Sequence, residues 1–242
     1  MKEAEFSADG KKLKGSLFFP KNLKATNPAI LFIHGWTSER KRSYQYANGL
    51  AKIGYVSFLF DMRGHGESEG DINTATTKEF FDDVLAAYDY LLGVKEVDKE
   101  NISAVGSSFG GYFAALLTGK RSIRRVVLRA PADYPNEDFN KSKMQSSGDE
   151  DPVVYEWRTQ PREPGETLAL SAIANFTGEV FIIESEKDDI VPHQTIQNYA
   201  NAVKDKSKLT HKVIKAAPHS IKDGPFKDEI EKALVGWFES KL

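Results

Sequence analysis

The chain has 242 residues, enough to bury one sizeable α/β core, so a single domain spanning residues 1–242 is the simplest organisation. Its 33 Lys and Arg against 35 Asp and Glu give a net charge of -2, without the basic excess typical of proteins that bind nucleic acid or anionic membranes. With no cysteine, the chain has neither disulfides nor thiolate metal sites. No apolar run approaches the roughly 20 residues of a membrane span, and the N-terminal stretch lacks the apolar core of a secretory signal. We therefore expect a cytoplasmic protein with a small-molecule partner, either a monomer or a homodimer.

The order of the predicted elements indicates an α/β fold. Residues 4–20 alternate apolar and polar side chains across the turn signal Asp9-Gly10, which predicts an antiparallel hairpin. Buried strands then alternate with amphipathic helices, which favours a mostly parallel sheet with helices on both faces and the hairpin at one edge. The strands are expected near residues 29–33, 55–60, 101–105, 125–130, 179–185 and 210–215, and the helices near 44–54, 76–93, 108–119, 194–203 and 225–242.

The regular pattern is interrupted between Pro131 and Thr177, a stretch rich in Pro, Asp, Glu, Ser and Asn. At about 45 residues it is too long for an ordinary connection, and irregular segments of that length are usually functional lids or disordered. The aromatic residues Tyr134, Tyr155 and Trp157 favour a small cap at about 131–177 within the single domain.

A candidate nucleophile lies where the strand near 101–105 leads into a helix. Gly106 and Gly110 flank Ser108 in a Gly-x-Ser-x-Gly pattern, in which small neighbours allow the central serine a sharp, strained turn. Ser107 does not fit, because Val105 stands where that reading needs a glycine. The alternative is a plain strand-to-helix turn in which the serine caps the helix. Nucleotide binding is disfavoured, since no Walker A or Gly-x-Gly-x-x-Gly pattern is present.

A serine hydroxyl needs a base, and the base needs an orienting carboxylate. On this kind of sheet the order along the chain is serine, acid, histidine, which selects His219 in the loop between the last strand and the last helix. The other histidines fit less well: they precede the serine or lie in a predicted helix or strand, at His34, His65, His193 and His211.

The acid is expected in the loop after the strand near 179–185. Asp188 and Asp189 both fit there, and the residues alone do not separate them. Either carboxylate could instead serve as a turn former or as a charge at a helix N-terminus.

Five motifs in order, "FIHGWTS", "FDMRGHGESEG", "VGSSFGG", "EKDDIVP" and "APHS", resemble the α/β-hydrolase superfamily. The resemblance spans nearly the whole chain and is closest to compact serine esterases and peptidase-like hydrolases with a small insertion, including the cinnamoyl or feruloyl esterase group. It implies that Asp188 is the acid and that the backbone N–H groups of Trp36 and Phe109 form the oxyanion hole. It also implies a structural turn around His65. Ser185 departs from the pattern, since many relatives have glycine there.

These features predict a serine hydrolase that cleaves carboxylic esters through an acyl-serine intermediate, with Ser108, Asp188 and His219 as the triad and no metal or organic cofactor. A peptidase, amidase or thioesterase uses the same machinery, and a non-catalytic ligand-binding relative would share the fold. Trp36 in the oxyanion loop, with Tyr134 and Trp157 in the insertion, predicts a binding site for small or aromatic acyl groups such as hydroxycinnamoyl. Alternatively, these rings only anchor the insertion.

Overall fold

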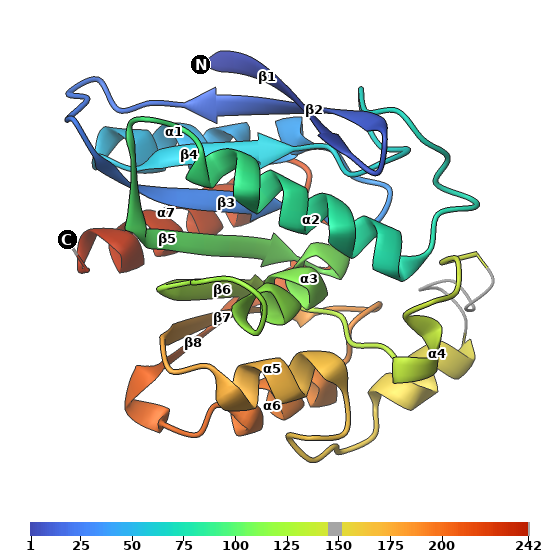
Figure 1. Ribbon diagram of the computed structural model, residues 1–242. Coiled ribbons are helices and arrows are strands. Elements are labelled where there is room, and N and C mark those ends of the chain that lie inside the picture. The colour runs from blue at the N-terminus through green and yellow to red at the C-terminus, as the bar shows by residue number, and fades with distance from the viewer. Residues whose placement is uncertain (145–151, 242) are drawn as a thin grey trace.

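An eight-stranded sheet forms the centre of the protein in the computed structural model, which describes residues 1–144 and 152–241 (Figure 1). The strands lie in the order β1-β2-β4-β3-β5-β6-β7-β8, with β1 and β2 antiparallel at one edge and β3 to β8 parallel. The predicted α/β-hydrolase fold, with its N-terminal hairpin on a mostly parallel sheet, is confirmed. The strands are β1 (Lys2–Ala8), β2 (Lys11–Phe18), β3 (Asn27–Ile33), β4 (Val56–Phe60), β5 (Val97–Ser107), β6 (Arg125–Arg129), β7 (Glu179–Lys187) and β8 (Leu209–Pro218).

Local sequence explains how two of these elements are bounded. Asp9 and Gly10 join β1 to β2 with φ angles of 47° and 75°, the left-handed conformations that a tight two-residue hairpin turn requires. At the start of α2 (Thr77–Leu92), the Thr76 side chain accepts a hydrogen bond from the Glu79 N–H, and the Glu79 side chain accepts one from the Thr76 N–H. This reciprocal capping box satisfies backbone donors that the first helical turn leaves unpaired.

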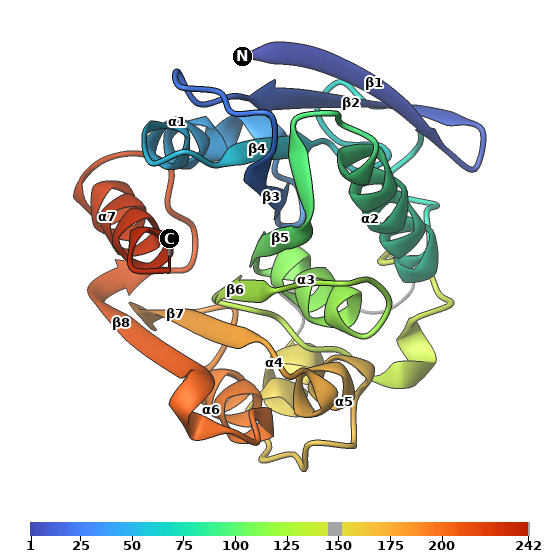
Figure 2. The same cartoon turned by 60° about the vertical axis from the view of Figure 1, so that its left-hand side comes forward.

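Helices cover both faces of the sheet and bury a separate apolar core on each (Figure 2). Side chains of a strand alternate between faces, so Ile30 and Phe32 of β3 belong to one core and Leu31 and Ile33 to the other. The first core contains α1 (Tyr44–Lys52) and α7 (Pro225–Glu239), and the second contains α2, α3 (Phe109–Thr118), α5 (Leu168–Asn175) and α6 (His193–Ala202). Short 3-10 helices lie at η1 (Arg40–Ser43), η2 (Asn136–Asp138) and η3 (Lys206–Lys208).

The segment predicted as an insertion at 131–177 has two parts. Its second part contains α5, which packs against α3 and α6 and so belongs to the helical layer over the sheet. Its first part contains η2 and α4 (Pro152–Arg158) and lies beyond this layer (Figure 1). Residues 145–151 of the predicted insertion lie outside the described residues.

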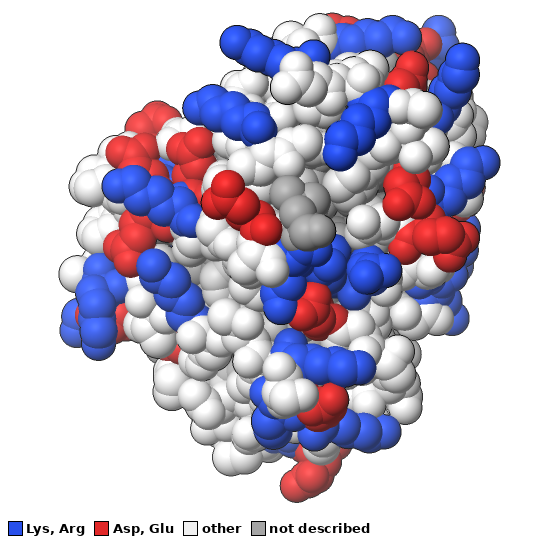
Figure 3. Space-filling model, turned by 90° about the vertical axis from the view of Figure 1, so that its left-hand side faces the viewer, with Lys and Arg blue, Asp and Glu red and all other residues white. Residues whose placement is uncertain are grey.

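The described helices include none that combines the length and the apolar character needed to cross a membrane. The end of the molecule at which β4 and β5 begin carries Lys and Arg interspersed with Asp and Glu (Figure 3). This mixed surface agrees with the net charge of -2.

Candidate active site

The turn between β5 and α3 holds Ser108 in a strained conformation at the C-terminal ends of the parallel strands. Its φ of 54° lies in the left-handed region, and its backbone N–H donates to the Arg129 carbonyl at 2.9 Å. The flanking glycines make the turn possible. A Cβ on Gly106 would lie 2.1 Å from the Gly110 oxygen, and a Cβ on Gly110 would lie 2.2 Å from the Ile33 oxygen. The Gly-x-Ser-x-Gly spacing is therefore a steric requirement of this turn.

A hydrogen-bond chain joins the three side chains predicted as a triad. His219, in the loop after β8, has its Nε2 2.9 Å from Ser108 Oγ and its Nδ1 2.8 Å from Asp188 Oδ2. The other oxygen of Asp188 accepts hydrogen bonds from the N–H groups of Ile190 and Val191, at 3.0 and 2.7 Å. An imidazole whose Nδ1–H donates to a carboxylate leaves Nε2 free to accept the serine proton. The arrangement can therefore activate Ser108 as a nucleophile.

The structure distinguishes the two aspartates that the residues alone left equal. The Asp188 side chain is buried against His219, at 6% exposure. Asp189 is exposed, and in the part of the chain that the structure describes it makes no hydrogen bond to that histidine. Only a carboxylate in contact with Nδ1 can select the tautomer of the ring.

The two amides predicted to bind an oxyanion belong to Trp36, in the loop after β3, and to Phe109, the first residue of α3. The Trp36 loop passes close to the serine, since a Cβ on Gly35 would lie 3.4 Å from Ser108 Cβ. Among the described residues, neither the Trp36 N–H nor the Phe109 N–H has a hydrogen-bond acceptor. Both donors are thus available to a negatively charged oxygen.

Two buried histidines hold the Trp36 loop in place. His34 Nε2 accepts a hydrogen bond from the Met62 N–H at 3.0 Å, and His65 Nε2 accepts one from the Thr37 N–H at 3.3 Å. In both rings Nδ1 bonds to a nearby backbone carbonyl, which fixes the neutral tautomer. Burial lowers the pKa of His34 to about 3 and also lowers the pKa of His65. These two histidines therefore act as uncharged acceptors that fix the backbone of the loop.

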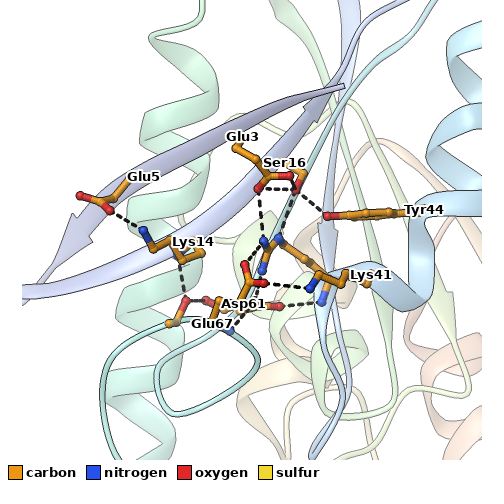
Figure 4. A network of polar contacts seen from close by, with 10 residues as sticks. Glu3, Glu5, Lys14, Ser16, Lys41, Tyr44, Asp61 and Glu67 are labelled. Carbon is orange, nitrogen blue, oxygen red and sulfur yellow. Dashed lines mark hydrogen bonds and ion pairs between the residues drawn. The ribbon is translucent and has the colours of Figure 1, made fainter.

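A buried ion-pair network fixes the next part of the same loop (Figure 4). The Arg40 guanidinium pairs with Asp61, whose side chain is fully buried, and with Glu67. Asp61 also accepts a hydrogen bond from the Arg40 N–H at 2.7 Å, and Arg40 Nε donates to Ser16 Oγ at 3.1 Å. The network connects η1 to β2 and to Asp61, the residue after β4. These contacts restrain the end of the loop that leads from β3 to η1.

A cavity of about 300 Å³ opens beside the serine. Ser108 and His219 line it together with Trp36, residues at the start of α1 and residues that follow His219. Of the three aromatic side chains predicted to bind substrate, Trp36 alone lines this cavity among the described residues.

The structure places Tyr134, which was predicted to bind substrate, in the core and not among the residues that line this cavity. It is 6% exposed, and its ring packs edge-to-face on Phe109 and Tyr112 at centroid distances of 5.7 and 5.0 Å. The Lys143 ammonium lies 4.1 Å from the Tyr134 ring centroid, 5.2 Å from that of Phe109 and 5.7 Å from that of Trp36. Lys143, which is 2% exposed, therefore occupies the space between these rings.

Trp157, on α4, is half-buried and stacks against the Arg162 guanidinium at 3.6 Å. In the described part of the chain it does not line the cavity beside Ser108. Its observed contact is with another residue of the insertion.

Sequence reasoning missed Arg129, at the C-terminal end of β6. Its guanidinium donates to Ser185 Oγ at 2.9 Å, to the Pro218 carbonyl at 3.3 Å and to the carbonyl of His219. Arg129 thus ties the histidine loop to β7, and Ser185 supplies one of its acceptors. The available signal was a charged residue at the end of the otherwise apolar strand "VVLR".

The remaining two histidines lie in a different cluster. His193 pairs with the buried Glu184, and His211 Nε2 lies 2.8 Å from the second oxygen of the same carboxylate. The described residues include no group of three or more His, Asp and Glu side chains that could hold a metal ion.

The sheet order, the strained serine turn and the Ser-His-Asp hydrogen bonds together define an α/β hydrolase. The family model described as serine aminopeptidase, S33, matches residues 24–167, and the chain belongs to this family. The predicted resemblance is thereby confirmed.

Curated relatives and solved structures extend the comparison. An uncharacterized protein of Mycobacterium tuberculosis is 29% identical over 76% of this chain and 60% of its own length. The human mitochondrial palmitoyl-protein thioesterase is 25% identical, again over 76% of this chain and 64% of its own length. The chain thus spans less than two thirds of these relatives.

Two solved structures share the fold across nearly the whole chain. Est1E from Butyrivibrio proteoclasticus, solved with ferulic acid bound, has a TM-score of 0.75, 18% identity and 98% coverage of both chains. An esterase of Pyrococcus furiosus has a TM-score of 0.72 and 21% identity, over 99% of this chain and 92% of its own.

Proposed function

We propose that this protein hydrolyses carboxylic esters through an acyl-serine intermediate. The observation that carries the proposal is the continuous hydrogen-bond chain from Ser108 through His219 to Asp188. His219 Nε2 takes the hydroxyl proton while Ser108 Oγ attacks the ester carbonyl, and the N–H groups of Trp36 and Phe109 stabilise the resulting oxyanion.

The second half of the reaction uses the same groups. Collapse of the tetrahedral intermediate breaks the ester bond, and the leaving alcohol takes the proton from His219. A water molecule then gives a proton to His219 and attacks the acyl-serine, which releases the carboxylic acid and returns the proton to Ser108. Asp188 stabilises the imidazolium formed in each step.

The substrate we propose has a small or aromatic acyl group. A cavity of about 300 Å³ lies at the lower end of the range for ligand pockets, and the Trp36 ring supplies an apolar face. The ferulic acid bound to the structural neighbour Est1E supports an aromatic acid of this size. Among the described aromatic residues predicted for the site, the proposal retains Trp36 and assigns Tyr134 and Trp157 no direct contact.

Thioester hydrolysis is the second candidate, favoured by the palmitoyl-protein thioesterase among the relatives. Esters, thioesters and amides of one acyl group, offered to the purified protein, separate these activities by kcat/KM. Amide cleavage as the fastest reaction would instead favour the peptidase activity in the family's description.

The proposal is tested by fluorophosphonate labelling and ester hydrolysis. Wild-type protein should be labelled at Ser108, and Ser108→Ala should lose labelling and roughly 10⁴-fold of its turnover, because only binding and oxyanion stabilisation remain. Ser107→Ala, which leaves the hydrogen-bond chain intact, should have a far milder effect. An active Ser108→Ala variant would overturn the assignment, and absence of both labelling and hydrolysis in wild type would favour a non-catalytic ligand-binding protein.

A further inference from the structure

The cavity beside Ser108 has an unbalanced charge. Three cationic side chains line it, Arg42, Arg129 and Lys222, and no Asp or Glu among the described residues does so. The net charge of the whole chain is -2, and the surface in Figure 3 mixes both signs. The cavity next to the candidate nucleophile is thus more positive than the chain as a whole.

None of these three cations has a carboxylate partner within ion-pair distance in the described chain. By contrast, the buried arginines Arg40 and Arg63 pair with Asp61 and Asp83. The partners of Arg129 are neutral hydroxyl and carbonyl oxygens, and its Nε is buried without any acceptor. Its charge therefore has no carboxylate in direct contact among the described residues, and the nearby Asp188 offsets it only in part.

The carboxylates that act electrostatically on Tyr46, which lines the cavity, already have other partners. Asp223 pairs with Lys227 at 3.0 Å, and Asp228 and Glu231 accept hydrogen bonds from Gln45 at 2.8 and 2.6 Å. Asp188 is bonded to the catalytic candidate His219.

Neutral donors complete the lining of the cavity. Burial raises the pKa of Tyr46 to about 12, so its phenol keeps its proton, and the hydroxyls of Ser43 and Ser220 also line the cavity. Guanidinium, ammonium and hydroxyl groups are the donors that bind carboxylate and phosphate oxygens.

We infer that this cavity binds a small anionic group, a carboxylate or a phosphate, carried by the ester that is hydrolysed at Ser108. The inference deepens the proposed ester hydrolysis and rests on it. An anion in the cavity would meet Arg129 directly beside the His219 loop, while Arg42 and Lys222 approach from the exposed rim. The charge on the substrate would then orient its scissile carbonyl toward Ser108.

Matched pairs of esters test this inference. On the acyl side, p-nitrophenyl hemiadipate is compared with p-nitrophenyl 6-methylheptanoate, which has a similar shape without the charge. On the alcohol side, the acetyl ester of glycolate is compared with that of glycolamide, and the acetyl ester of 2-hydroxyethyl phosphate with that of its neutral dimethyl phosphate triester. At low ionic strength, kcat/KM for at least one anionic ester should exceed that of its neutral counterpart by about tenfold or more, and added salt should reduce this preference. The pair that shows it identifies carboxylate or phosphate.

Variants connect the preference to the cavity. Arg42→Gln and Lys222→Gln should each lower the ratio of anionic to neutral kcat/KM by about three- to tenfold. The matched control is Arg124→Gln, an exposed arginine beside the opposite end of β6 with no ion pair in the described chain, which should leave the ratio unchanged.

The outcomes separate the two proposals. Cleavage of neutral esters with no preference for any charged one, or a preference that neither variant alters, overturns the anion site and leaves ester hydrolysis standing. Failure of every ester to react, together with no labelling of Ser108, overturns the proposed ester hydrolysis itself.

Discussion

Replacing Gly110 by alanine should impair catalysis without removing any catalytic group. The new Cβ would lie 2.2 Å from the Ile33 carbonyl oxygen and 2.5 Å from that of His34, both of them backbone atoms at the end of β3. Since Cβ contacts essentially never fall below 3.0 Å, α3 and β3 must separate by about 0.8 Å, the difference between 3.0 and 2.2 Å. Ser108 and Phe109 at the start of α3 would move with the helix.

A displacement of about 1 Å at reacting groups costs about 10²-fold in rate, and overpacking costs about 1–3 kcal/mol of stability. The assay is kcat/KM on the best ester, with urea unfolding to show that the Gly110→Ala variant is folded. The control is Gly236→Ala in α7, where an added Cβ meets no atom within 4 Å and alanine should stabilise the helix by up to about 1 kcal/mol. A folded Gly110→Ala variant with kcat/KM within twofold of wild type would refute the steric reasoning.

Three further predictions concern the groups around the nucleophile. Asp188→Asn should lower kcat by about 10⁴-fold, because an amide no longer selects the histidine tautomer. Asp189→Asn should leave kcat nearly unchanged, and equal losses of kcat in the two variants would contradict the choice of Asp188 as the acid. Burial gives His34 a folded-state pKa of about 3, below its ordinary 6.5, so its stabilising contribution is complete above pH 6.5 and is lost as pH falls toward 3. Between pH 7 and pH 4.5, the free energy of unfolding measured with urea should fall by about 3 kcal/mol more in wild type than in His34→Gln, whose glutamine oxygen can still accept the Met62 N–H but does not titrate. Equal decreases in the two proteins would argue against a neutral, buried His34. Arg40→Gln should lower the free energy of unfolding by about 3–5 kcal/mol in the same assay, because it leaves the buried Asp61 carboxylate without its cation. A decrease of less than about 1 kcal/mol would contradict a buried ion pair.

Much of the fold could be predicted from patterns within short stretches of the sequence. Runs such as residues 29–33 and 180–183 are apolar throughout because both faces of a central parallel strand are covered, and the confirmed strands β3 and β7 lie there. The hairpin turn at Asp9-Gly10 and the sharp turn at Ser108 are also visible in neighbouring residues, although Gly110 is required by its close approach to Ile33 of β3 as well. Each requires a particular backbone conformation of residues adjacent in the chain, so the sequence carries the information directly.

Other features depend on segments that are distant in the chain. The sequence left Asp188 and Asp189 equal, because a one-residue difference in a loop decides which carboxylate meets a histidine 31 positions away. The helix α5 was hidden within the predicted insertion, because a helix of eight residues in a polar stretch is recognised by its packing against α3 and α6.

The positions of the aromatic side chains also could not be predicted from the sequence. Tyr134 and Trp157 are amphipathic rings in an insertion, and composition cannot tell a substrate wall from a packing anchor. The arrangement of the second core places Tyr134 under Lys143, and Trp157 stacks on Arg162 instead of facing the cavity.

The sequence by itself therefore determined the strand-helix order, the sharp turn at Ser108 and the type of chemistry its motifs support, since each of these leaves a pattern in residues that are close together in the chain. The tertiary structure alone decided which side chains share the cavity. Arg129 precedes His219 by 90 residues, and only the pairing of β6, β7 and β8 brings its guanidinium against the histidine loop. Because charge acts through space and not along the chain, the cationic character of the cavity emerges only when Arg42, Arg129 and Lys222 converge on it.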